Sequence, residues 1–254
     1  MIATLRLYGR EAVRAARLGA RAWPVAFSLL LYAALIQLCA TLVAPLGLAG
    51  GFLMGFVAAA CISSYLHLLS LAVDGSKVTF RDLKQSFGAR FWDVVSVLFA
   101  FWIIDFILAA LTRSMGDKGA IVRVLAGLAM TVFFNPVPEL LYRGSSRSFG
   151  LLADAGRFIS KHGIEWLLPN LIIAAALLAP TGVLHRPEMG ARVLEVQKVF
   201  TPSGLAGVVG SVPLWLMPLL LLAIHWAMVF RGLLYGALVS GAARRRDLSE
   251  FWRR

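Results

Sequence analysis

The stretch that decides the fold is WPVAFSLLLYAALIQLCATLVA, residues 23–44, which contains no charged side chain. A bilayer core about 30 Å thick requires roughly 20 apolar residues in a crossing α-helix. This stretch therefore predicts a membrane-spanning helix. It is too long for the apolar part of a signal peptide, and no small-residue cleavage site follows it, so we expect an uncleaved first span.

The rest of the chain has the same apolar character. Of its 254 residues, 59% are hydrophobic and only 15% are charged, whereas soluble domains are about 25% charged. This composition argues against a water-soluble enzyme and against a disordered chain. Strand-like alternation is absent, and helices satisfy their own backbone hydrogen bonds in lipid. We predict an all-α polytopic membrane protein with six transmembrane helices in three hairpins, joined to short interfacial amphipathic helices. The predicted spans are about 23–44, 48–73, 92–112, 120–142, 164–180 and 212–238.

The basic residues predict the orientation. Nineteen of the 25 lysine and arginine residues fall in the N-terminal tail, the loops after the second and fourth spans, and the C-terminal end. Because such residues accumulate on the cytoplasmic side, we expect both termini there. The alanine, arginine and glycine usage suggests a GC-rich genome, and we expect a bacterial inner (cytoplasmic) membrane. The basic residues are dispersed over four membrane-proximal segments, so we expect no nucleic-acid partner.

Three regions follow from this pattern: a basic interfacial amphipathic helix over 1–22, a six-helix transmembrane domain over 23–240, and a basic cytoplasmic tail over 241–254. At 100° per residue, the arginines of the first region fall within about 80° of arc. Binding of anionic lipid headgroups or of a cytoplasmic partner is one interpretation, and a topology anchor is the other. These candidate anionic-lipid contacts are Arg6, Arg10, Arg14, Arg17 and Arg21.

The returning helices share a motif. Each is expected to end at a glycine, Gly75, Gly144 or Gly241, followed by a basic amphipathic stretch. The triplet Arg-Asp-Leu occurs at both 81–83 and 246–248. Either an internal repeat or chance similarity explains this pattern.

Charged residues inside a span are costly and are functional candidates by default. Asp105 lies 13 residues beyond Trp92, about 20 Å along a helix, and His225 lies at a similar predicted depth. The two form a candidate intramembrane proton site. The alternative is a single structural hydrogen bond.

A second candidate is a polar cavity that faces the cytoplasm. His67, Asn135 and Arg231 each lie eight to ten residues before the glycine expected to end their helix, and Glu139 lies nearer the mouth. Prolines 136 and 138 would free backbone carbonyls in the same layer. This set predicts a site for an anionic headgroup or a carboxylate. The alternative is that Arg231 snorkels to the interface while Asn135 caps a neighbour.

Catalytic signatures are absent from the sequence. It contains no H-E-x-x-H, no Walker loop and no G-x-S-x-G, and its four histidines are widely separated. We expect no enzymatic activity, no cofactor and no metal.

Two segments carry a resemblance. Residues 75–111 comprise a glycine, a helix with Phe80, Arg81, Asp82 and Leu83, and then a span. Residues 135–178 comprise a proline-bearing span end, a glycine turn, a short amphipathic helix and another span. This layout, over about 70–230, resembles the six-helix membrane domain of some glycerophosphoryl diester phosphodiesterases and related uncharacterised bacterial inner-membrane families. No soluble phosphodiesterase domain is present, so the resemblance implies a fold and no activity.

The expected function is that of a non-enzymatic inner-membrane protein, an envelope or lipid-related scaffold or accessory subunit. Its expected partners are the lipid bilayer, including anionic lipids, and a membrane or cytoplasmic protein. The alternative is a transporter component such as the permease subunit of an ABC exporter. In that case residues 5–22 would form the N-terminal interfacial helix and residues 77–91 the cytoplasmic helix between spans two and three.

Overall fold

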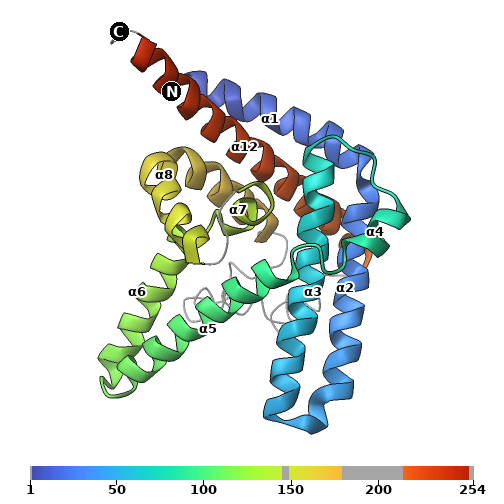
Figure 1. The fold of residues 1–254 in the computed structure, drawn as a ribbon, viewed down its shortest axis with the longest axis vertical. Helices are drawn as coiled ribbons and strands as arrows, with labels where there is room; N and C mark the ends of the chain where they lie inside the picture. The colour runs from blue at the N-terminus through green and yellow to red at the C-terminus, as the bar shows by residue number, and fades with distance from the viewer. Residues whose placement is uncertain (1, 145–148, 179–213, 252–254) are drawn as a thin grey trace.

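The described part of the chain is helical throughout. A computed structural model describes residues 2–144, 149–178 and 214–251, and every regular element in these ranges is a helix (Figure 1). The long elements are α1 (Ile2–Arg21), α2 (Trp23–Val43), α3 (Leu48–Val73), α5 (Phe91–Arg113), α6 (Asp117–Phe133), α8 (Phe149–Leu178) and α12 (Met217–Phe251). The short elements are η1 (Ala44–Leu46), α4 (Phe80–Ser86), α7 (Val137–Arg143) and η4 (Leu214–Leu216).

Five segments are long and apolar enough to cross a membrane. They are Trp23–Leu46, Ala49–Val73, Phe91–Arg113, Lys118–Arg143 and Met217–Gly241. They coincide with five of the six predicted spans, and this all-helical architecture fits a polytopic all-α membrane protein. The remaining predicted span, 164–180, begins in the second half of α8 and ends beyond the described residues.

Two of the predicted hairpins are visible. Helices α2 and α3 form one and α5 and α6 form the other, and Figure 1 shows them pointing down and spread apart. Each turn ends at a glycine with positive φ, Gly47 at 52° and Gly116 at 55°. Residues with a Cβ rarely adopt this conformation, so glycine permits the following helix to begin at once. The connection of the third predicted hairpin, 179–213, lies outside the described residues.

The core lies where the returning helices meet. Helices α3, α7 and α12 all pack on one another, and each contributes a pair of consecutive buried leucines. These pairs are Leu68 and Leu69, Leu140 and Leu141, and Leu233 and Leu234. Close packing of this kind, rather than exclusion of water, holds helices together in lipid.

One arginine ties the first hairpin to α7. The Arg90 amide donates to the Ser63 hydroxyl of α3 at 3.0 Å. Its guanidinium donates to the backbone carbonyls of Leu141 and Tyr142 in the last turn of α7. Terminal helix carbonyls lack intrahelical donors, and a cation at this end also complements the helix dipole.

The outgoing helices begin at similar backbone breaks. Ala22 precedes α2 with φ −102° and ψ 29°, and Arg90 precedes α5 with φ −132° and ψ 24°. His162 interrupts α8 with φ −128° and ψ 16°. Three predicted spans thus each begin after the same kind of backbone bend.

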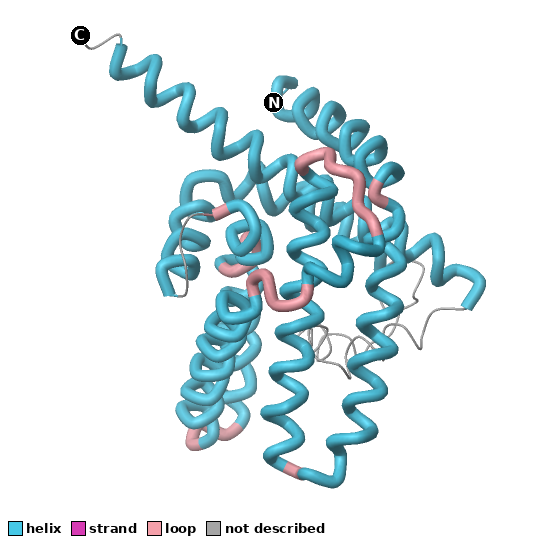
Figure 2. Tube along the Cα trace, turned by 45° about the vertical axis from the view of Figure 1, so that its right-hand side comes forward, coloured by secondary structure: helices cyan, strands magenta, loops and turns pink. Residues whose placement is uncertain are grey.

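The C-terminal boundary differs from the prediction. Gly241 does not end a helix, because α12 continues without a break to Phe251. Within a helix, one glycine costs about 1 kcal/mol relative to alanine and is tolerated. In Figures 1 and 2, the start of α1 and the end of α12 lie at the same end of the molecule, opposite the two hairpin tips.

Candidate functional site

Three of the four residues predicted for the polar cavity meet in the structure. The Arg231 Nε donates to Glu139 Oε1 at 2.7 Å, and its Nη2 donates to Glu139 Oε2 at 2.9 Å. The same Nη2 donates to the Asn135 backbone carbonyl at 2.7 Å. The Glu139 side chain is fully buried and that of Arg231 is 16% exposed. This bidentate geometry is the strong form of an ion pair.

Trp166 of α8 completes this group. Its indole Nε1 donates to the Asn135 side-chain oxygen at 2.8 Å. The Arg231 guanidinium carbon lies 5.1 Å from the centre of the Trp166 ring, within the range of a cation–π contact. The sequence pattern did not identify Trp166 as a candidate, because a tryptophan in an apolar run is usually a core residue. We call Asn135, Glu139, Trp166 and Arg231 the buried cluster.

The prolines explain how the cluster forms. Helix α6 ends at Phe133 and α7 begins at Val137, with Pro136 between them and Pro138 in the first turn. Proline has no N–H and cannot continue a helix. The helical path is interrupted between Phe133 and Val137, and the Asn135 carbonyl in this break accepts from Arg231. Glu139 lies in the first turn of α7, where the positive end of the helix dipole favours a carboxylate.

The arrangement acts as a clamp between elements. It joins α7 to α12 through the ion pair, and both to α8 through Trp166. Both oxygens of Glu139 are occupied by Arg231. The prediction of an open cavity is therefore revised, because the carboxylate and the guanidinium that would receive a ligand satisfy each other.

His67 lies elsewhere. It is half-buried on α3, on the side of α4, where its charge acts on Asp82. Hydrogen bonds from the Thr79 hydroxyl and amide lower the pKa of Asp82, and His67 and Arg81 add smaller effects in the same direction. Thr79 and Asp82 form a reciprocal capping box that begins α4. His67 is therefore not part of the group that Arg231, Glu139 and Asn135 form.

The predicted pair of Asp105 and His225 is wrong. Asp105 Oδ1 lies 3.4 Å from the Arg123 Nη2 of the neighbouring helix α6. Both side chains are about half exposed, at 50% for Asp105 and 52% for Arg123. His225 is instead buried beside Gly19 of α1. Equal depth does not make two residues neighbours when their helices are not adjacent.

Helix α1 exposes all five of its predicted lipid-contact residues, Arg6, Arg10, Arg14, Arg17 and Arg21. We call this set the arginine face. Arg10 and Arg14 share the buried Glu11, at 2.9 Å and 3.8 Å. Among the carboxylates whose side chains the structure describes, none lies within ion-pair distance of the other three.

The opposite face of α1 packs against protein. Its buried stripe includes Ala15 and Gly19, and the Trp226 indole of α12 donates to the Ala12 carbonyl at 3.2 Å. The Tyr8 hydroxyl donates to the Glu165 carbonyl of α8 at 2.8 Å. Burial, with a contribution from the Glu165 charge, raises the pKa of Tyr8. The predicted interfacial helix is thus docked on α12 and α8, and this docking fixes which way its arginines point.

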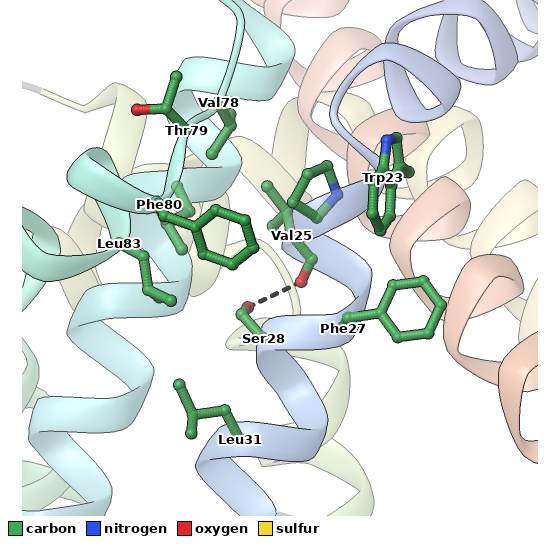
Figure 3. A pocket seen from close by; sticks show the side chains of 11 residues that line it. Trp23, Val25, Phe27, Ser28, Leu31, Val78, Thr79, Phe80 and Leu83 are labelled. Carbon is green, nitrogen blue, oxygen red and sulfur yellow. Dashed lines mark hydrogen bonds between the residues drawn. The ribbon is translucent and has the colours of Figure 1, made fainter.

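A small groove lies where α1 joins α2. It has a volume of about 140 Å³ and is lined by Trp23, Phe27 and Leu31 of α2 and by Phe80 and Leu83 of α4, among others (Figure 3). Phe80 is 81% exposed and Trp23 is 53% exposed. The lining is almost entirely apolar, which suits a hydrocarbon chain.

Comparisons with known proteins returned nothing that resembles this chain: no family model, no curated protein and no solved structure matches it. The resemblance to the phosphodiesterase membrane domain therefore stays a prediction.

Proposed function

We propose that this protein is a non-enzymatic scaffold of a bacterial inner membrane, and that its arginine face holds anionic phospholipid at the cytoplasmic surface. The observation that carries the proposal is the orientation of α1. One side of this helix is buried on α12 and α8, and the other side presents five arginines to the surroundings.

Most arginines of the arginine face form no ion pair with a carboxylate side chain that the structure describes. No carboxylate side chain that the structure describes is an ion-pair partner of Arg6, Arg17 or Arg21, while Glu11 serves both Arg10 and Arg14. Each basic side chain at an anionic membrane surface contributes about 1 kcal/mol to binding. Arginine also pairs with a phosphate through two parallel hydrogen bonds.

The groove supports the same function. Trp23 at its rim follows Arg21 by two residues, so an acyl chain in the groove would place its headgroup beside the arginine face. The proposed topology has six crossings, with 164–180 as the fifth and both termini in the cytoplasm. The common position of α1 and of the end of α12, opposite the hairpin tips, supports an even number of crossings.

The test compares two variants that lose the same charge. R17Q/R21Q alters the arginine face, and R113Q/K118Q alters exposed residues near the tip of the α5–α6 hairpin. The purified protein in neutral detergent is titrated with short-chain phosphatidylglycerol and with phosphatidylcholine. We expect R17Q/R21Q to weaken phosphatidylglycerol binding about tenfold and to reduce its dependence on salt. Equal weakening by R113Q/K118Q would contradict a specific site on α1.

A transporter component is the second candidate function, and α4 favours it. This short helix lies between α3 and α5 and starts with a complete capping box. It is therefore a stable helix to which an ATPase subunit could bind. Copurification of a stoichiometric ATPase subunit would support this function. Recovery of the protein with lipid and without such a subunit would support the scaffold.

A further inference from the structure

The α5–α6 hairpin carries an ion pair where lipid would otherwise surround it. Asp105 lies within the span Phe91–Arg113 and Arg123 within the span Lys118–Arg143. Both side chains remain about half exposed after they contact each other at 3.4 Å. Charged groups within a span normally face a bundle interior or another polar group, because exposure to hydrocarbon is costly.

The surroundings of the pair are apolar and unpacked. Trp102 and Phe106 flank Asp105 on α5 and are 55% and 63% exposed. On α6, Gly127 lies one turn after Arg123, and a Cβ built on it would meet no atom within 4 Å. Small residues beside a polar group are typical of transmembrane helix contacts, because they permit a close approach of two backbones.

We propose that this face of the α5–α6 hairpin binds a second copy of the same chain, and that Asp105 of each copy pairs with Arg123 of the other. The argument is charge complementarity. One face carries one acid and one base in adjacent helices, so a two-fold axis brings opposite charges together twice. Two exchanged pairs would remove four half-exposed charged groups from the hydrocarbon.

Crosslinking measures the contact in membranes. Cys39 and Cys61 are first replaced by alanine, and the probe is A120C on α6, one turn before Arg123. The matched control is A49C, another exposed alanine that follows the glycine turn of the α2–α3 hairpin. We expect A120C to form disulfide-linked dimers at least about tenfold more than A49C. Equal crosslinking of the two would overturn the proposal, as would an A120C product that remains a single chain on gels.

Complementation separates exchange between copies from pairing within one copy. In the A120C background, D105N alone and R123Q alone should each reduce the dimer about tenfold. When the two variants are coexpressed with different tags, a mixed dimer retains one exchanged pair, although neither chain retains its own. We expect the mixed crosslink to recover to several times the level of either variant alone. Absence of recovery, with both variants folded and inserted, would show that the pair acts only within one chain.

Discussion

Two carboxylate–arginine pairs lie within the candidate spans, and they differ in almost every respect. Glu139 and Arg231 meet through two hydrogen bonds of 2.7 and 2.9 Å, with the carboxylate fully buried. Asp105 and Arg123 meet at 3.4 Å, with both side chains half exposed. The first pair is extended by Asn135 and Trp166, while the second is bordered by exposed aromatic residues. The buried pair and its neighbours hold α7, α8 and α12 together, whereas the exposed pair leaves one face of the α5–α6 hairpin free to bind another molecule.

The largest expected effect comes from breaking the buried cluster. R231Q leaves the Glu139 carboxylate without its partner in a site with no exposure. Removing one member of a buried pair typically costs about 3–5 kcal/mol. We expect a loss of this size in the free energy of unfolding, measured by denaturant titration in detergent micelles.

The control for R231Q is D105N, which breaks the exposed pair. It should cost the isolated chain less than R231Q does, because both side chains of this pair stay half exposed and the contact is longer. A larger loss for D105N than for R231Q would reverse the comparison between the two pairs.

The next effect comes from close packing in the core. At Gly232 of α12, an added Cβ would overlap the Tyr142 hydroxyl and lie 2.8 Å from Val73 Cγ2. We expect G232A to destabilise the protein by about 1–3 kcal/mol. At Gly55 of α3 the same Cβ would meet nothing within 4 Å, so G55A should be neutral or slightly stabilising. Thermal unfolding of both variants measures the difference, and similar losses would argue against a tight α12 contact.

A smaller effect tests the role of Trp166 within the buried cluster. W166F removes the hydrogen bond to the Asn135 side chain and weakens the cation–π contact, while most of the apolar ring remains. We expect a loss of about 1–2 kcal/mol. In the R231Q background the loss should shrink, because the cation is gone. Full additivity of the two substitutions would mean that the cation–π contact contributes nothing to stability.

The smallest effect concerns the pH dependence of α4. The pKa of Asp82 is lowered mainly by the Thr79 hydrogen bonds. Its contribution to helix stability is therefore complete above the unfolded pKa, near 3.9, and is lost as the pH falls through the folded value. Amide exchange in α4, corrected for intrinsic rates, should accelerate a few-fold on acidification in the wild type and not in D82N. Equal acceleration in the wild type and in D82N would show that the capping box does not cause the pH dependence.

The spans could be predicted from sequence because length and apolarity alone decide them. Asn135 and Arg231 were brought together by counting residues back from Gly144 and Gly241, although Gly241 does not end its helix. The same count failed for His67, because it fixes depth and not the face of the helix. The prediction that Asp105 pairs with His225 failed for a related reason. Asp105 lies on α5, which packs on α3, α6 and α8, whereas His225 lies on α12 where that helix packs on α1. Which helices are neighbours was not readable from hydropathy.

Two further patterns in the sequence mark the starts of helices and the buried core. Gly-Ala-Arg-x-Trp occurs at 19–23 and again at 88–92, at the bends that precede α2 and α5. The Leu-Leu pairs at 68–69, 140–141 and 233–234, on α3, α7 and α12, are all buried. Together they mark equivalent positions in the predicted units more clearly than the Arg-Asp-Leu triplet does.

The most direct test of the central claim is a pair of double-mutant cycles on the free energy of unfolding of the monomer in detergent. One cycle uses E139Q and R231Q, and the other uses D105N and R123Q. The account predicts a coupling of at least about 2 kcal/mol for the buried pair and less than about 0.5 kcal/mol for the exposed pair. Equal couplings, or a larger one for Asp105 and Arg123, would contradict the assignment of the first pair to the fold and the second to association.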